Sequence, residues 1–138
     1  MAKKIIGYTT GAFDLFHIGH LNLLRKCKLN CDYLIVGVST DELIESYKNN
    51  KPSITLNDRV EILKSIRYVD KVVVQYDRDK LEAAKKIKCD VMFVGSDWKG
   101  SEIFTKLEVE LKKIKVDLKF FEYTKRISTT QIKKDIKK

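Results

Sequence analysis

The segment Lys4–Lys26 reads K-I-I-G-Y-T-T-G-A-F-D-L-F-H-I-G-H-L-N-L-L-R-K, and its pattern sets the expectation for the fold. It opens with a short apolar run, passes Gly11, and from Ile18 onward places apolar residues three to four positions apart. This pattern predicts a buried strand over 4–9, a loop, and a helix beginning near residue 18. The chain's two histidines, His17 and His20, fall at the predicted start of that helix.

The rest of the chain continues the alternation of strand and helix. Apolar runs predict further strands over 32–39, 71–74, 90–94 and 116–121. Helical spacing predicts helices from about 40, and over 56–66, 79–88, 101–114 and 129–137, and the polar segment 47–53 is expected to be a mobile loop. Such alternation is typical of βαβ units. We therefore expect an α/β, Rossmann-like, doubly wound fold: one domain over 1–138, with a mostly parallel five-stranded sheet and helices on both faces.

Composition narrows the class of protein. The chain has 138 residues, of which 43% are hydrophobic and 34% charged, as in ordinary globular domains. It contains no run of 18 apolar residues and no apolar signal segment after Met1, so we expect a cytoplasmic protein without a membrane span. The three cysteines have no paired spacing and are expected to be reduced thiols packed as small apolar groups.

The net charge of +9 is unevenly distributed. Residues 125–138 hold six Lys or Arg and one Asp, a net +5, and the remaining +4 is spread over 124 residues in which Lys and Asp or Glu alternate. A basic C-terminal end suits a polyphosphate ligand as well as an RNA backbone. We expect no nucleic-acid partner, since the rest of the chain has the charge pattern of solvated helices, although charge alone does not decide between the two ligands.

Ligands of parallel sheets bind beyond the carboxyl ends of the strands, so site residues should follow strands. The first cluster that passes this test surrounds the start of the helix that is predicted to begin near residue 18. A glycine allows close approach of an anion, and a helix start offers free N–H groups. Two imidazoles three residues apart lie on one side of a helical turn and can donate hydrogen bonds to phosphate. The alternative is two unrelated surface histidines beside a turn. The candidate residues are Thr10, Gly11, Ala12, Phe13, Asp14, His17, Gly19 and His20.

Two further clusters follow the fourth and fifth predicted strands. In Gly95–Trp98, the Asp97 carboxylate can accept from an amino group or a ribose hydroxyl, and the Trp98 indole can stack on a base. Alternatively, these residues are a helix cap and a core tryptophan. The segment Ile127–Thr130 opens the last helix and forms an anion cradle, or else a plain N-cap. Its members are Ile127, Ser128, Thr129 and Thr130, preceded by Lys125 and Arg126.

The fourth cluster is basic. Lys48 and Lys51 lie in or beside the polar loop, and Arg67 follows the predicted 56–66 helix. Long cations on a mobile loop can close over a bound phosphate. Each of them taken singly is more often a surface charge.

Four motifs in this order resemble a known family. G-A-F-D-L-F-H-I-G-H, S-I-R-Y-V-D, G-S-D-W-K-G and I-S-T-T together resemble the cytidylyltransferases of the glycerol-3-phosphate cytidylyltransferase type, within the HxGH nucleotidyltransferase superfamily. The resemblance implies that CTP reacts with a phosphorylated alcohol by in-line attack on the α-phosphate, giving a CDP-alcohol and pyrophosphate. It also implies Mg²⁺ held chiefly by the nucleotide and water, a homodimer with 67–70 at the interface, and a product that supplies wall or capsule polymers.

The resemblance also implies roles for the candidate residues. His17 and His20 would stabilise the transition state, and Phe13 and Asp14 would shape the nucleotide site, with Asp14 touching a metal-bound water. Arg67 would hold a phosphate of substrate or nucleotide. Lys48 or Lys51 would reach the triphosphate, and Asp97 and Trp98 would lie at the nucleoside end. Ser128, Thr129 and Thr130 would bind the β- and γ-phosphates.

The chain departs from the family pattern at a few positions. Ahead of I-S-T-T the family has R-T-x-G, whereas here Tyr123 replaces the arginine and Arg126 replaces the glycine. Since a phenol cannot supply the bidentate charge of a guanidinium, Lys125 or Arg126 takes that role, or the substrate differs, or activity is impaired. Ala12 and Ser96 replace a threonine and an aspartate in the nucleotide site.

Three alternatives stay open from the sequence. The first is an adenylyltransferase of the same superfamily, of the heptose-phosphate or FMN type, although W-K-G after Asp97 favours the cytidylyl branch. The second is a cytidylyltransferase for phosphoethanolamine or phosphocholine. The third is a non-catalytic nucleotide-binding or RNA-binding relic, suggested by Tyr123 and the basic tail.

Overall fold

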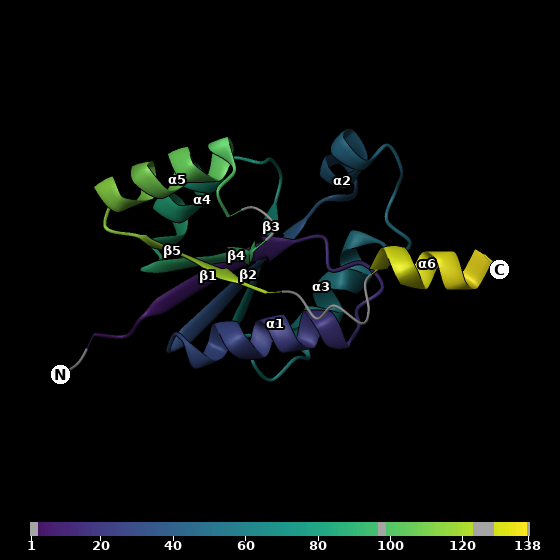
Figure 1. The fold of residues 1–138 in the computed structure, drawn as a ribbon. Coiled ribbons are helices and arrows are strands. Elements are labelled where there is room, and N and C mark those ends of the chain that lie inside the picture. Colours follow the sequence, from purple (N-terminus) through teal and green to yellow (C-terminus); the bar gives the residue numbers. More distant parts are fainter. Residues whose placement is uncertain (1–2, 97–98, 123–128, 138) are drawn as a thin grey trace.

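The structure, a computed structural model, describes residues 3–96, 99–122 and 129–137 (Figure 1). Its strands are β1 (Ile6–Gly11), β2 (Tyr33–Ser39), β3 (Lys71–Gln75), β4 (Val91–Gly95) and β5 (Asp117–Phe121). Its helices are α1 (Ile18–Leu29), α2 (Asp41–Lys48), α3 (Leu56–Lys64), α4 (Lys80–Ile87), α5 (Glu102–Lys113) and α6 (Thr129–Lys137). The predicted order of strands and helices is confirmed, with ends that differ by one or two residues in most elements.

The five strands form one sheet in the order β3-β2-β1-β4-β5, and the described pairings are all parallel. The chain runs outward from β1 to β3 and then returns to β4 on the other side of β1. The carboxyl ends of β1 and β4 therefore form the topological switch point, where open α/β sheets bind ligands. The first and second candidate clusters follow these two strands.

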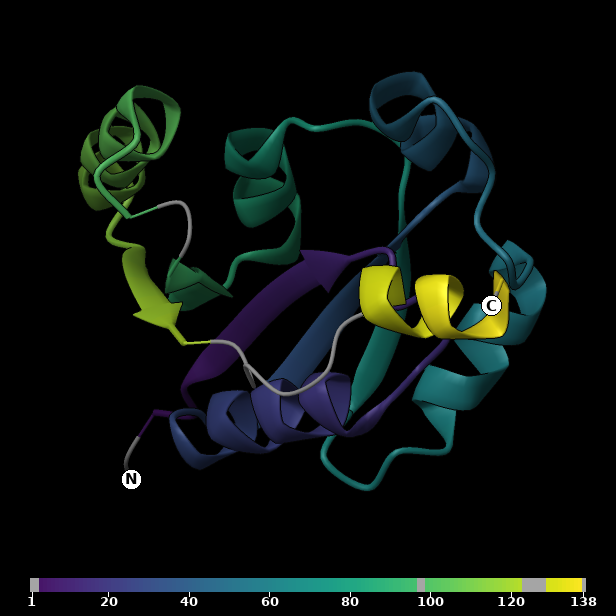
Figure 2. The ribbon, with the colours of Figure 1, turned by 45° about the vertical axis from the view of Figure 1, so that its right-hand side comes forward.

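Helices cover both faces of the sheet, as predicted (Figure 1, Figure 2). On one face, Leu24 of α1 and Leu63 of α3 pack against Val36 and Phe93 of the sheet. On the other face, α4 and α5 pack over a second cluster through Ala84, Phe104 and Leu111. Helices α2 and α6 lie at the carboxyl end of the sheet, outside these two layers (Figure 1).

Two local predictions differ from the structure. The sequence places Thr55 three residues before Asp58, a pattern that predicts a capping box at a helix start. Thr55 is the N-cap of α3, but its side chain makes no capping hydrogen bond, so this capping box is absent. In α5, Ile103 has the helical spacing to Leu107 that predicts a buried position, but it is 74% exposed, because the first turn places Phe104 against the sheet instead. A three-residue spacing leaves this choice open when two neighbouring residues are both apolar.

The cysteines lie on both sides of the sheet. Cys27 belongs to the cluster under α1 and Cys89 to the cluster under α4 and α5. Burial raises the pKa of Cys89 to about 11, and burial likewise raises the pKa of the Cys27 thiol. These two thiols thus pack as apolar groups in separate cores. Within the described ranges, no helix has the length and apolar character needed to cross a bilayer.

Gly37 is required by the close approach of Tyr8 across the β1–β2 pair. Tyr8 is fully buried, its hydroxyl donates to Gln75 Oε1, and a Cβ on Gly37 would lie 2.0 Å from that hydroxyl and 2.8 Å from Cζ. We expect Gly37→Ala to lower the free energy of unfolding by about 1–3 kcal/mol, because the phenol must leave its site and its hydrogen bond. Urea denaturation measures this change.

The control is Tyr8→Phe, alone and combined with Gly37→Ala. Since the hydroxyl makes the closest contact, the double variant should be more stable than the sum of the two single effects allows. Strict additivity of the two single effects would contradict the explanation.

Candidate active site

The two histidines form a reciprocal cap at the start of α1. His17 is the N-cap residue, and its Nδ1 accepts the Gly19 N–H at 3.0 Å. His20 Nδ1 accepts the backbone N–H of His17 at 3.1 Å, and the two ring centroids are 4.0 Å apart. The imidazoles therefore lie together at one helix terminus, as their spacing predicted.

These hydrogen bonds fix the tautomer of both rings. Since each Nδ1 accepts a backbone N–H, the proton of each neutral imidazole resides on Nε2. Burial, with repulsion from His17 and Lys48, lowers the pKa of His20 to about 4, and burial lowers the pKa of His17. At neutral pH the site thus presents two uncharged Nε2–H donors, which suit the charged oxygens of a phosphate.

The loop that leads into this helix is conformationally strained. Phe13 and Leu15 both have left-handed backbone, with φ of 51° and 49°, and they flank Asp14. The left-handed conformation is energetically unfavourable for residues other than glycine, and strained backbone of this kind is found most often at functional sites. Phe13 is buried, and its ring and that of Phe16 lie 5.5 and 5.2 Å from the His20 ring. Both aromatic rings thus pack beside His20, and burial is the largest cause of its lowered pKa.

Asp14 ties three segments together. Its carboxylate oxygens accept the N–H groups of Ser53 and Ile54 at 2.8 and 2.9 Å, and Lys133 Nζ lies 3.4 Å away. Its carbonyl accepts the Thr129 hydroxyl at 2.8 Å, which links α6 to the same loop. Burial would raise the pKa of Asp14, but these donors outweigh burial and hold the pKa below its usual value. The charged carboxylate is therefore the form that this contact network stabilises.

We expect Asp14→Asn to lower the free energy of unfolding by about 1–3 kcal/mol at pH 7, because an amide cannot accept from both N–H groups. The depressed pKa gives stability that is present above the unfolded value near 4 and is lost as pH falls through the folded value. The difference between Asp14→Asn and wild type should therefore shrink below pH 4. Thermal melts from pH 3 to 7 measure it, and a constant difference over that range would contradict the role of the charge.

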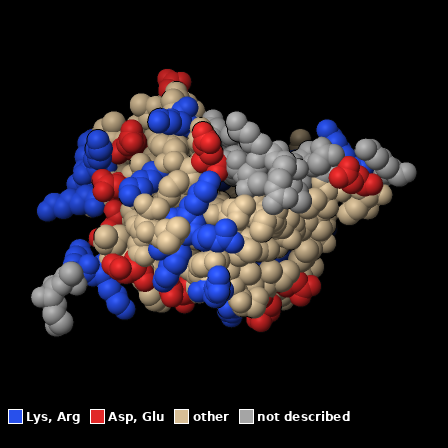
Figure 3. Space-filling view, turned by 60° about the horizontal axis from the view of Figure 1, so that its bottom comes forward, with Lys and Arg blue, Asp and Glu red and all other residues tan. Residues whose placement is uncertain are grey.

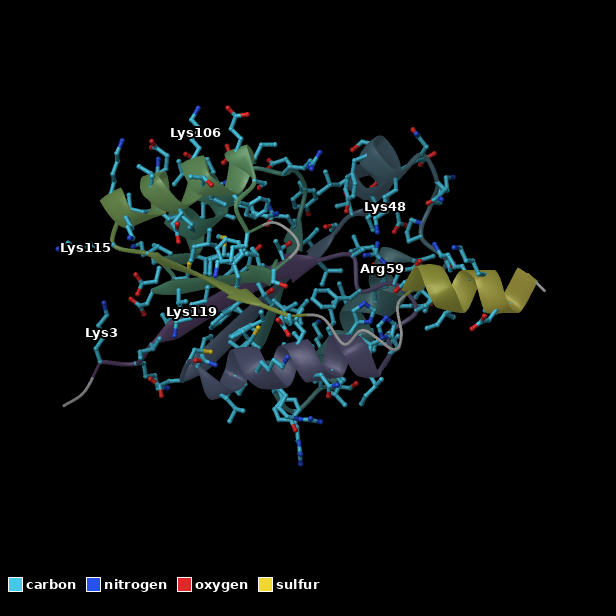
Figure 4. All side chains as sticks on the ribbon, in the orientation of Figure 1. Lys3, Lys48, Arg59, Lys106, Lys115 and Lys119 are labelled. Carbon is cyan, nitrogen blue, oxygen red and sulfur yellow. The ribbon has the colours of Figure 1, made fainter. Side chains whose placement is uncertain are left out.

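Sequence reasoning missed Arg59, which is fully buried on α3. Its guanidinium donates to the carbonyls of Ala12, Ser39 and Ile54 at 2.8, 2.7 and 2.9 Å, and pairs with Asp41. It thus connects the segments after β1 and β2 with the loop before α3. Figure 4 shows Arg59 and Lys48 at the same end of the molecule, near α6. The signal was present in the sequence, because Arg59 falls at helical spacing inside the apolar face of α3.

The predicted basic residues are not all brought together. Lys48 ends α2, and its charge acts on the pKa of His20, which places it in the electrostatic environment of the site. Lys51 is exposed in the loop that follows α2. Arg67 instead donates to the Tyr68 hydroxyl at 2.8 Å, ahead of β3 and thus at the amino end of the sheet. The described structure does not bring Arg67 to the histidines, because a loop that precedes a parallel strand lies opposite the ligand-binding edge.

Other predicted residues have the following places. Thr10 and Gly11 end β1, and the buried Thr10 hydroxyl lies close to the Tyr8 phenol without a well-formed hydrogen bond. The predictions for seven residues, and for the side chain of Thr130, fall outside the described part of the chain. The seven are Asp97, Trp98, Tyr123, Lys125, Arg126, Ile127 and Ser128.

The surface carries charges of both signs. On the face drawn in Figure 3, Lys and Arg side chains stand with Asp and Glu side chains between and around them.

The fold and the site together define a class of protein. A Rossmann-like sheet with paired imidazole donors at the helix after β1 has the architecture of an HxGH nucleotidyltransferase.

Comparison with known proteins specifies the family. A family model described as cytidylyltransferase-like matches residues 8–135. The chain is 40% identical to a glycerol-3-phosphate cytidylyltransferase from Bacillus spizizenii and 37% identical to one from Staphylococcus aureus. Both matches cover 97% of this chain, with 97% and 95% of the respective relatives. This chain belongs to the cytidylyltransferase-like family, and the prediction that it is a nucleotidyltransferase of this type is confirmed.

A solved structure bears out the fold. The lipopolysaccharide core biosynthesis protein from Thermoplasma volcanium matches with a TM-score of 0.74 over 88% of this chain and 99% of that one. The two sequences are 24% identical, so this similarity concerns the fold alone.

Proposed function

We propose that this chain transfers the cytidylyl group of CTP to glycerol 3-phosphate and releases pyrophosphate. The full-length similarity to glycerol-3-phosphate cytidylyltransferases supports the choice of substrates. The observation that carries the chemistry is the reciprocal cap of His17 and His20, which leaves two Nε2–H groups as donors. Such donors are suited to an α-phosphate on which negative charge builds.

In the proposed reaction, a phosphate oxygen of glycerol 3-phosphate attacks the α-phosphorus of CTP. The bond to the pyrophosphate oxygen breaks on the opposite side, and CDP-glycerol and pyrophosphate result. His17 and His20 donate hydrogen bonds to the non-bridging oxygens of the α-phosphate. Lys48 and Lys51 neutralise the triphosphate, and no covalent enzyme intermediate is involved. Catalysis then consists of positioning and charge stabilisation.

Mg²⁺ is part of the proposal as a companion of the nucleotide. Asp14, the one candidate for contact with a metal-bound water, already engages Ser53, Ile54 and Lys133. Within the described ranges, no group of three His, Cys, Asp or Glu side chains is arranged to hold a metal ion. The residues present therefore fit an ion held mainly by phosphate oxygens and water, and the ion would offset the charge of the triphosphate. In this proposal Asp14 positions the loop.

The proposal includes a cytoplasmic homodimer with residues 67–70 at its interface. Arg25 and Arg67 both donate to the Tyr68 hydroxyl, at 3.2 and 2.8 Å, and they form an exposed polar cluster around its ring. An interface location would give Arg67 a role other than the phosphate contact that its motif implied. Light scattering at assay concentrations tests the dimer, and a monomer mass would count against it.

The experiment that tests the function is pyrophosphate release with Mg²⁺ and each of CTP, ATP, GTP and UTP, crossed with a panel of phosphorylated alcohols. We expect turnover with CTP and glycerol 3-phosphate. Turnover with CTP and phosphoethanolamine or phosphocholine would change the acceptor, and turnover with ATP would move the chain to the adenylyltransferases. Silence across the panel would identify a nucleotide-binding relic.

A further inference from the structure

The edge of the sheet opposite the histidines carries exposed apolar side chains. Because the described strand pairings are all parallel, the amino ends of the strands share one edge, and the candidate active site lies at the other edge. Ile5 precedes β1, Leu29 ends α1 ahead of β2, and Ile114 follows α5 ahead of β5. Their exposed fractions are 46%, 79% and 37%. Large apolar side chains that gather on an exposed surface indicate contact with another molecule or with a membrane.

Backbone hydrogen bonds hold the segments of this edge side by side. The Asp32 N–H donates to the Ile5 carbonyl at 2.8 Å. The Asp90 N–H donates to the Ile6 carbonyl at 2.7 Å, and the Asp117 N–H donates to the Asp90 carbonyl at 3.0 Å. These contacts follow the strand order β2-β1-β4-β5, so the segments form one continuous surface. We call this surface, made of residues 3–5, 28–32, 88–90 and 112–117, the basic edge.

The basic edge has a surplus of positive charge. Its segments contain seven lysines and three aspartates. Two of the aspartates are engaged by the backbone, since Asp32 Oδ2 accepts the Ile5 N–H and Asp90 Oδ2 accepts the Ile6 N–H, both at 2.8 Å. Four of the lysines form no ion pair with any residue that the structure describes. These exposed lysines are Lys4, Lys88, Lys112 and Lys115.

Two of these lysines occupy positions that favour glycine. Lys88 and Lys115 have left-handed backbone, with φ of 59° and 62°, where α4 and α5 end. Glycine is the usual residue at such positions, because a Cβ makes this conformation unfavourable. The helix macrodipole favours lysine near a helix end, but each helix already has two lysines in its last turn. The dipole therefore does not explain lysine in place of glycine, whereas contact with an external anion does.

The mixture of side chains selects the kind of anion. Lysines alone would suit any polyanion, but apolar side chains among them suit the boundary between the headgroups and acyl chains of a bilayer. The orientation is also suitable. Figure 4 shows Lys3 and Lys115 at one end of the molecule, and Lys48 and Arg59 at the other. A bilayer on the basic edge would therefore leave the histidines facing water.

We propose that the basic edge binds the surface of a phospholipid bilayer that contains anionic lipids. Ile5, Leu29 and Ile114 lie at the boundary of the acyl chains, and the lysines contact the anionic headgroups. This binding is peripheral and requires no membrane-spanning helix. The segment 67–70, proposed for the dimer interface, precedes β3 and lies outside the basic edge. The proposal does not depend on which substrates the chain uses, because its test measures binding and not turnover.

Sedimentation with vesicles of phosphatidylcholine and phosphatidylglycerol in equal parts measures this binding, with vesicles of phosphatidylcholine alone as the reference. We expect the full chain to bind the anionic vesicles, and added salt to weaken the binding. Lys88→Gly combined with Lys115→Gly should weaken it by about 10- to 30-fold, since each lysine near an anionic surface contributes about 5-fold. The Tm of this double variant should equal or exceed that of wild type. Leu29→Ser should weaken vesicle binding by about 5-fold.

The control is Lys106→Gln combined with Lys134→Gln, which removes the same charge from exposed positions on α5 and α6 outside the basic edge. It should weaken vesicle binding by less than about 3-fold. Equal losses in the two double variants would assign the binding to net charge and overturn the proposal. Absence of binding to the anionic vesicles, or a marked loss of Tm in the glycine variant, would also overturn it. Binding of a fluorescent single-stranded RNA without vesicle binding would instead identify a nucleic-acid surface.

Discussion

His20→Asn is expected to lower kcat by about 10²–10³-fold while the free energy of unfolding stays within about 0.5 kcal/mol of wild type. The asparagine carbonyl sits where His20 Nδ1 now accepts the His17 N–H, so the cap of α1 is retained. What is lost is the Nε2–H donor, and removal of one preorganised donor to a transition-state oxyanion typically has an effect of this size.

The matched variant is His20→Gln. Its amide nitrogen reaches the position of Nε2, so it should retain more of kcat than His20→Asn, and its amide oxygen can accept the His17 N–H as in a capping box, so its stability should also stay close to that of wild type. Steady-state kinetics and urea denaturation on the two variants separate catalysis from capping. Equal loss of kcat in both, in proportion to the loss of stability, would show that His20 acts only through the fold.

The protonation state can be observed directly, because the chain holds no other histidines than His17 and His20. NMR titration of the ring protons should give a midpoint for His20 near pH 4, well below the ordinary value of about 6.5. Since the folded pKa is depressed, the stability due to neutral His20 is present above pH 6.5 and is lost as pH falls toward 4. A midpoint above 6.5 would mean that the imidazolium, and not the neutral ring, faces the phosphate.

The sequence was sufficient for the order of elements and for the histidine pair. Apolar runs such as 32–39 have the length and β-branched content of buried strands, and the histidine spacing places both rings on one helical turn. These are local properties, and local patterns survive folding unless packing opposes them. Ile103 is a case in which packing did so, because the adjacent Phe104 took the buried position.

The partners of the charged groups could not be obtained in this way. The donors to Asp14 come from residues about forty positions further along the chain, and no periodicity connects the two segments. The alternation D-R-D-K over 77–80 does not indicate that Asp77 and Asp79 line the groove between β3 and α4, whereas Arg78 lies over the ring of Tyr47. Such pairings depend on which loops the sheet order brings to one edge, and Arg67 was assigned to that edge although it precedes a strand.

Arg59→Met is expected to lower the free energy of unfolding by about 3–5 kcal/mol, among the largest single effects in the protein. The change leaves three carbonyls, those of Ala12, Ser39 and Ile54, without their shared donor. The Asp41 carboxylate also loses its partner, but its side chain is 34% exposed and water can replace the guanidinium there. The carbonyl contacts therefore account for most of the loss.

Two companion variants test this division. Asp41→Asn should cost about 1–3 kcal/mol, less than Arg59→Met, because the fully buried guanidinium loses its ion-pair partner but Asn Oδ1 can still accept its hydrogen bond. Arg59→Lys keeps the charge but not the planar fork of donors, so it should fold with intermediate stability and should lose kcat/KM by more than its stability explains. The reason is that Ala12 and Ile54 lie on the loops that carry the histidines and the lysines of the site. If Asp41→Asn is as destabilising as Arg59→Met, the ion pair and not the carbonyl clamp holds these loops, and Arg59 positions the site through α2 alone.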